Sequence, residues 1–160
     1  MNIEMYDTEK NINTDDISIL EKKLDKTFPS QYRVFLLQYN GGYPFPSIFN
    51  IQWKDQQWAS GYDKGSVSEF YAINSETKSS DLLHRSLTLE GRIPNTTMAI
   101  AKAEGGDILL IGTAAHNAGK IYFWALSFET DDAEEADFSN IGFVADDFNQ
   151  FMKNLYDNEN

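Results

Sequence analysis

A single helix with both of its end signals dominates this sequence, in the segment from Phe28 to Gly42. Pro29 suits the first helical position, because a proline lacks the N–H that would be unpaired there. Four apolar side chains then recur at the spacing i, i+3, i+4 and i+7, on one face of a helix: Tyr32, Phe35, Leu36 and Tyr39. Asn40, Gly41 and Gly42 follow, and these residue types accept the positive φ of a helix C-terminus. The segment therefore predicts an amphipathic helix over residues 30–39, closed by a structural C-cap.

Apolar periodicity predicts three more helices, and each begins at a hydroxyl or acidic capping sequence. They are a helix that starts at Thr14-Asp15-Asp16, ends near residue 26 and buries Ile17, Leu20 and Leu24; a short helix after Ser79-Ser80-Asp81 that carries Leu82, Leu83 and Leu87; and a last helix after Asp146-Asp147 that buries Phe148, Phe151 and Leu155. The first of these comes directly before the 30–39 helix, so we expect the two to form a helical hairpin or corner.

The middle of the chain has the composition of β-strands. Segments rich in aromatic and β-branched residues cover 47–53, 67–73, 97–102, 108–112 and 121–126. Turn-forming sequences at 104–107 and 116–119 join the last three as hairpins. The segment 121–126 is apolar at nearly every position, so we expect a central strand covered on both faces.

These elements predict an α+β fold, in which helices at both chain ends pack on one face of an antiparallel sheet of about five to six strands of mixed length. We expect one domain over residues 1–160, since no linker or repeat divides the chain. Residues 1–13 are polar with few apolar anchors, and we expect them to be loosely held.

Composition excludes several classes of protein. The chain has no cysteine, which rules out disulfides, thiolate catalysis and cysteine metal sites. Apolar residues make up 41%, enough for a packed core. The N-terminus has two acids and no basic residue among its first seven positions, unlike a signal peptide, and the apolar runs are too short to cross a bilayer. We therefore expect a soluble, cytoplasmic protein without a membrane partner.

The formal net charge is −12, and it is unevenly distributed. Residues 129–160 hold ten acids and one lysine, whereas residues 1–128 hold fifteen acids and twelve Lys or Arg. Such a surface repels nucleic acid, so no nucleic-acid partner is expected. Two interpretations of the charge stay open: it serves solubility alone, or it attracts a partner protein with a basic surface.

No residue pattern predicts a reaction. The Asn40-Gly41-Gly42 turn lacks the Lys-Ser/Thr of a phosphate-binding loop, and His84 and His116 have no second ligand at metal spacing. Glu104 and Asp107 share one tight turn, which we interpret as a turn with solvated charges. No serine lies in a Gly-x-Ser-x-Gly setting. We therefore predict no catalytic residue, no cofactor and no metal site.

Two groups of residues are candidates for binding a partner. Six acids crowd into nine positions with no basic residue among them: Glu129, Asp131, Asp132, Glu134, Glu135 and Asp137. Such a run is a solvated loop, a docking patch for a basic protein or, least in keeping with its spacing, a Ca²⁺ site. Trp58 and Tyr62 lie in a polar stretch, where exposed aromatic side chains would be interface anchors. For Trp53 and Phe70 we expect core packing.

Several segments together resemble the SUKH superfamily, which includes bacterial toxin-immunity proteins, the Syd protein and fungal cell-wall-assembly regulators. The similar segments, in order, are Glu21, Leu24, Pro29, Tyr32, Phe35, Leu36 and Asn40-Gly41-Gly42; Ile100-Ala101 with Gly105-Gly106-Asp107 and the strand 108–112; the strand 119–124; and Val144-Ala145-Asp146-Asp147-Phe148 with Phe151 and Leu155. Residues 54–95 hold no landmark of the family.

The resemblance implies a protein that binds and does not catalyse. Bacterial members typically neutralise a cognate toxin by docking on it, and they use no cofactor or metal. We therefore expect an immunity protein that occludes a toxin with a basic surface. The alternative is an intracellular regulatory or scaffold module, as in the fungal relatives, and an enzyme is the class with no supporting motif. The toxin's identity and the oligomeric state stay open.

Overall fold

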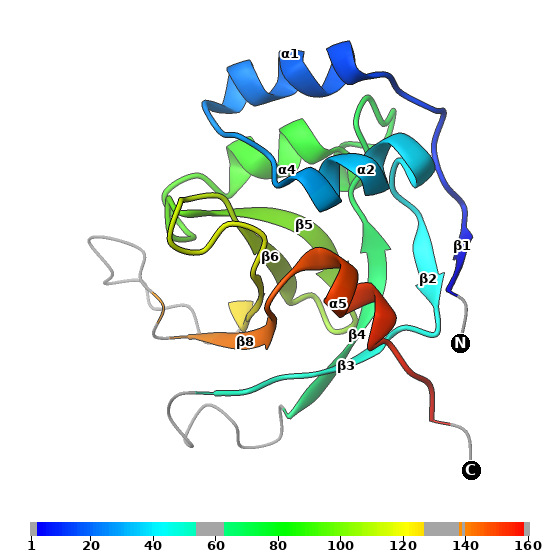
Figure 1. Ribbon diagram of the computed structural model, residues 1–160, viewed down its shortest axis with the longest axis vertical. Helices are drawn as coiled ribbons and strands as arrows, with labels where there is room; N and C mark the ends of the chain where they lie inside the picture. Colours follow the sequence, from blue (N-terminus) through cyan, green and yellow to red (C-terminus); the bar gives the residue numbers. More distant parts are fainter. Residues whose placement is uncertain (1–2, 54–62, 127–137, 139, 159–160) are drawn as a thin grey trace.

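The computed structural model describes residues 3–53, 63–126, 138 and 140–158, and it shows an α+β fold (Figure 1). The helices and strands are, in chain order, β1 (Glu4–Tyr6), α1 (Thr14–Leu24), α2 (Ser30–Tyr39), β2 (Tyr43–Phe45), β3 (Ile48–Asn50), β4 (Lys64–Phe70), the 3₁₀ turn Lys78–Ser80, α4 (Leu82–Thr88), β5 (Thr97–Ala103), β6 (Ile108–Gly112), β7 (Ile121–Trp124), β8 (Ile141–Ala145) and α5 (Phe148–Lys153). The predicted α+β class is confirmed.

Six strands form one antiparallel sheet in the order β3-β4-β5-β6-β7-β8, and β1 and β2 form a separate two-stranded ribbon. Strand β8 and both strands of the ribbon were not predicted from the sequence. The prediction that 121–126 is the central strand also needs correction. All five residues of β6 are buried, whereas β7 lies second from the end of the sheet and its Tyr122 is half-buried. The apolar sequences of β6 and β7 do not distinguish the two strands, because each pairs with a strand on both sides and both are largely buried.

The sheet curls until its two ends meet. Just beyond β3, Gln52 exchanges two backbone hydrogen bonds with Phe143 of β8, each 2.8 Å long. A glycine makes this approach possible, because a Cβ on Gly142 would lie 2.4 Å from Cγ2 of Ile51. The outer strands of the six-stranded sheet are therefore partly closed on each other, which covers edges that would otherwise be free.

Local capping explains where the helices begin. Asp81 and Asp147 accept hydrogen bonds from the backbone of α4 and α5, as predicted. The N-cap of α1 is Asn13 and not the predicted Thr14, and Asn13 and Asp16 form a reciprocal capping box. Pro29 stands directly before α2, one position earlier than predicted.

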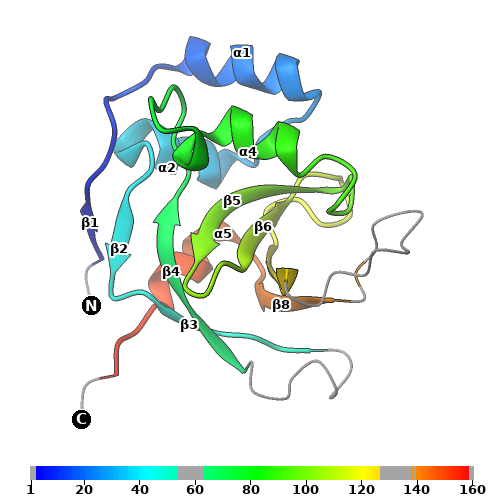
Figure 2. The same cartoon turned by 180° about the vertical axis from the view of Figure 1, so that it is seen from behind.

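Helices α2 and α5 lie on the same face of the sheet, in front of the strands in Figure 1 and behind them in Figure 2. Helix α1 is at the top in both views, with α2 and α4 between it and the sheet. An aromatic cluster fills the space between α2, α5 and the sheet: the Phe35 ring centroid is 4.8 Å from the centroids of both Phe70 and Phe148. The apolar stripe of the opening helix is therefore core, as its spacing indicated.

Candidate functional site

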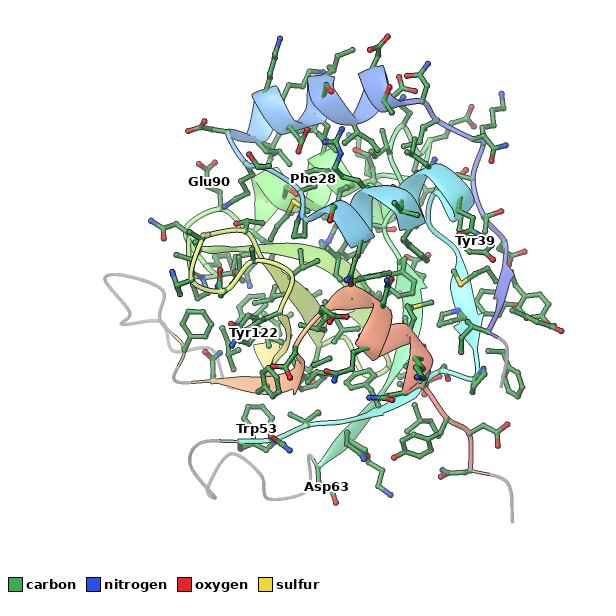
Figure 3. The ribbon with its side chains drawn as sticks, in the orientation of Figure 1. Phe28, Tyr39, Trp53, Asp63, Glu90 and Tyr122 are labelled. Carbon is green, nitrogen blue, oxygen red and sulfur yellow. The ribbon has the colours of Figure 1, made fainter. Side chains whose placement is uncertain are left out.

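The partner-binding residues predicted from the sequence lie outside the described part of the chain. This holds for Trp58, Tyr62 and the six acids Glu129, Asp131, Asp132, Glu134, Glu135 and Asp137. Trp53 and Asp63, labelled in Figure 3, border the first of these segments. Trp53 is half-buried with its ring edge-on to Phe123, and Phe70 is fully buried, so the core packing predicted for both is confirmed.

Asn40 connects three segments that are distant in sequence. Its backbone N–H closes α2 on Leu36, and its side-chain amide donates to the carbonyls of Lys10 and Ile73 at 2.9 and 3.1 Å. Its Oδ1 accepts from the Ile73 N–H at 2.8 Å, and its backbone carbonyl accepts from the Glu9 N–H at 3.0 Å. Asn40 is only 1% exposed, so a single buried side chain fastens the N-terminal segment and the chain just beyond β4 to the end of α2.

The two glycines after Asn40 are needed for close approach. A Cβ on Gly41 would lie 2.8 Å from the Cβ of Ala72, and one on Gly42 would lie 2.5 Å from the carbonyl oxygen of Tyr6. Both glycines also have a positive φ, of 85° and 94°. The Asn-Gly-Gly sequence is therefore a structural junction, which confirms its prediction as a C-cap and adds a side-chain role that the sequence did not show.

The prediction for the acidic turn after β5 was wrong for one of its two acids. Glu104 is exposed, as expected, but Asp107 is 4% exposed and its Oδ1 accepts from the Leu126 N–H at 2.9 Å. Asp107 was predicted to be solvated, because a tight turn between hairpin strands usually faces water. It instead fixes the chain just beyond β7 to the start of β6. This carboxylate serves the fold.

The two histidines lie apart, His84 half-buried in the first turn of α4 and His116 exposed in the loop before β7. Within the described ranges, no three His, Cys, Asp or Glu side chains come together as a metal site would require. Nor is any helix in these ranges long and apolar enough to cross a membrane. Two features of the described surface are suited to contact with another protein.

The β1–β2 ribbon carries such a feature on its outer face. The two strands pair with Glu4 opposite Phe45 and Tyr6 opposite Tyr43, so these four side chains share one face, and all four are exposed. The Tyr6 and Tyr43 rings stack with their centroids 5.3 Å apart and an interplanar angle of 24°. The Tyr6 hydroxyl donates to the Glu4 carboxylate, and this hydrogen bond, with the negative charge of Glu4, raises the pKa of Tyr6. The alternation of side chains was visible in the sequence, but three residues are too few for a period of two to be recognised.

A second candidate is a groove of about 620 Å³ between the C-terminal end of α1 and the segment from α4 to β5. Its apolar lining includes Leu24, Leu87 and Ile93, and Leu87 is more than half exposed. Charges of both signs border it, namely Lys23, Lys26, Asp25 and Glu90 (Glu90 is labelled in Figure 3).

Basic and acidic side chains lie together at the same end of α1. Lys22, Lys26 and Arg33 line a hollow of about 780 Å³ beside the groove. Lys26 donates to the carbonyl of Asn95 at 2.7 Å, and its partial burial lowers its pKa. Arg33 pairs with Glu21, whose other carboxylate oxygen accepts from the Phe28 N–H at 2.7 Å. These contacts tie the α1–α2 connection together.

Comparison with known protein families gives one match. The model of the SMI1/KNR4 family (SUKH-1) matches residues 11–154, which is most of the chain. No curated protein matches the sequence. The matched range includes Pro29, Asn40 and both glycines of the junction, the residues with which the sequence resemblance began.

Proposed function

We propose that this chain, which belongs to the SMI1/KNR4 family (SUKH-1), is a non-enzymatic immunity protein that neutralises a cognate bacterial toxin by docking on it. The observation that carries the proposal is the family match over residues 11–154. An immunity protein or a regulator-like module is consistent with this family, which is generally not catalytic.

The surface chemistry supports binding over catalysis. In the described part of the chain, the conspicuous exposed cluster is aromatic, on β1 and β2, and it lies beside an acid. Tyrosine and phenylalanine are enriched at protein interfaces because they bury a large area at a small entropy cost. A catalytic site instead needs a positioned nucleophile or acid–base pair in a sheltered cleft.

The mechanism that we propose is steric occlusion assisted by charge. A chain of net charge −12 attracts a basic toxin, and the acids of residues 129–137 supply much of the excess charge. The association rate should then fall steeply as salt is added, because exposed charges are screened beyond about 10 Å at 0.1 M ionic strength. An association rate that does not change with salt would remove the electrostatic part of the mechanism.

The experiment is capture followed by a toxicity test. The tagged protein is used at low salt to recover partners from the lysate of the source organism, and the gene of each recovered protein is expressed alone and with this chain. A partner whose C-terminal domain arrests growth alone, and whose effect is abolished by co-expression, supports immunity. As a control, an Asn40→Ala chain, in which the fold is weakened, should protect less well.

The alternative is a regulatory or scaffold module, which the matched family also allows. It predicts that the recovered partners are not toxic and that a toxin gene does not lie beside the gene for this chain. That outcome would overturn the immunity proposal and leave the family assignment unchanged.

A further inference from the structure

The outer face of the β1–β2 ribbon is organised before any partner arrives. The Tyr6–Tyr43 stack holds both rings in place, and the Tyr6 hydroxyl holds the Glu4 carboxylate beside them. Fixed side chains lose little conformational entropy on binding, so more of the contact energy appears as affinity. Phe45, 51% exposed, extends the apolar area next to Glu4.

The chemistry of this face fits a cation. The faces of aromatic rings attract ammonium and guanidinium groups, and a carboxylate within reach adds a charge-assisted hydrogen bond. Glu4 is the single charged residue of the four, and Asp7 and Glu9 follow it with no basic residue between positions 3 and 9. An arginine can stack on a ring and bind a carboxylate at the same time, which a lysine does less well.

The α1–α4 groove is less suited to a cationic partner. The border of the α1–α4 groove carries Lys23 and Lys26 beside Asp25 and Glu90, and the neighbouring hollow is lined by Lys22 and Arg33 together with Glu21. A positively charged segment that entered the groove would meet two lysines as well as two acids, whereas the charged residue of the β1–β2 face is an acid. Charge complementarity therefore favours the β1–β2 face.

We infer that the outer face of the β1–β2 ribbon, formed by Glu4, Tyr6, Tyr43 and Phe45, is a docking surface for an arginine-bearing segment of a partner protein. The guanidinium group lies on the stacked tyrosine rings and pairs with the Glu4 carboxylate. The inference rests on the proposed function, because it names the surface by which this chain would hold a basic toxin.

The test uses a short peptide of alternating arginine and glycine as the probe. A peptide with citrulline in place of arginine is the uncharged control. Each is titrated into the full-length, ¹⁵N-labelled protein while backbone amide shifts are recorded. The arginine peptide should shift the amides of β1 and those of Tyr43 and Phe45, and the citrulline peptide should leave them unchanged. Shifts confined to other residues, such as those of the acidic run 129–137, would overturn the inference.

Two variants on the face and two elsewhere sharpen the result. Tyr43→Ile keeps a residue that favours strands but removes the ring, and Glu4→Gln keeps the shape but removes the charge. Each should weaken binding of the arginine peptide by about threefold to tenfold. Val34→Ser and Glu104→Gln, which remove an exposed apolar group and an exposed acid at other places, should bind as the unchanged protein does. Equal binding by all four variants would overturn the inference.

The same variants separate this inference from the proposed function. If co-expression establishes a toxin and Tyr43→Ile binds it as tightly as the unchanged chain does, the docking surface is wrong and immunity stands. If the peptide maps to the β1–β2 face and no captured partner is toxic, the surface stands and immunity fails.

Discussion

The side-chain amide of Asn40 makes two hydrogen bonds with the backbone of Ile73, one to the carbonyl and one from the N–H. This pairing resembles that between two strands, but one of its partners is a side chain at the end of α2. It holds the chain that leaves β4 against the helix, at a point where both residues are buried.

Replacing Asn40 by alanine should therefore be among the more damaging single changes in this chain. The change leaves the buried backbone groups of Ile73 without their partner, and each such group costs about 1–3 kcal/mol. We expect Asn40→Ala to lower the free energy of unfolding by about 2–4 kcal/mol, measured by urea denaturation. Asn149→Ala, an exposed asparagine in α5, is the control and should change stability by less than about 0.5 kcal/mol. Equal effects of the two changes would contradict the role assigned to Asn40.

The closure of the sheet gives a second prediction, at Gly142. A methyl group there would meet Cγ2 of Ile51 at 2.4 Å and the Trp53 ring at 3.1 Å. We expect Gly142→Ala to destabilise the fold by about 1–3 kcal/mol through overpacking. The cost should shrink when Ile51 is first changed to alanine, because the space that this change opens accommodates the new methyl group. A double-mutant cycle of urea midpoints measures this coupling, and purely additive effects would show that the two residues do not meet.

The elements whose signals are local could be predicted from the sequence. Capping residues such as Asp81 and Asp147, and the apolar stripe of α2, act within a few positions, so they can be read along the chain. The contact between Gln52 and Phe143 joins positions far apart, and no periodicity records it. Strand β8 was missed because a strand of five residues that includes a glycine gives a weak signal.

The candidate site was harder to predict from the sequence than the fold was. The predicted acids at 129–137, together with Trp58 and Tyr62, lie outside the described residues and stay a prediction. The Glu4, Tyr6, Tyr43 and Phe45 face brings together two segments almost forty positions apart, and this pairing became visible only with the register of the ribbon. Asp107 was predicted to be a solvated residue of a turn, but it is buried and accepts a hydrogen bond from the Leu126 N–H.

The two oxygens of Glu21 make different contributions, and three variants separate them. One oxygen pairs with Arg33, which is partly exposed, and the other accepts from the N–H of Phe28, whose side chain is buried. Arg33→Ala removes only a partly solvated ion pair and should cost about 0–1 kcal/mol. Glu21→Ala also leaves the N–H unpaired and should cost about 1–3 kcal/mol more.

Glu21→Gln keeps an acceptor for the Phe28 N–H but not the charge. Its effect on the urea midpoint should therefore be close to that of Arg33→Ala and smaller than that of Glu21→Ala. If Glu21→Gln destabilised the fold as much as Glu21→Ala, the ion pair and not the backbone hydrogen bond would be the main contribution of this residue.

Tyr32 gives a prediction about pH. Its ring is fully buried against Phe28 and Phe148, and its hydroxyl has no hydrogen-bond partner among the described residues. Burial disfavours the ionised form and raises the pKa of Tyr32 far above the usual tyrosine value of about 10. In the unfolded chain the same hydroxyl ionises near that usual value. The stability that depends on the neutral hydroxyl is thus fully present below about pH 10 and is lost as pH rises above it.

Above about pH 10 the folded protein holds a proton that the unfolded chain has released, so Tyr32 should lower the free energy of unfolding by up to about 1.4 kcal/mol per pH unit. Tyr32→Phe should remove this contribution and leave those of the other tyrosines whose pKa is raised, namely Tyr6, Tyr71 and Tyr122. At pH 7 the same change should be neutral or slightly stabilising, because it removes a buried hydroxyl that has no partner. Urea denaturation of both proteins from pH 7 to 11 measures the difference. Parallel curves would mean that Tyr32 is hydrated, and a large loss at pH 7 would mean that its hydroxyl is hydrogen-bonded.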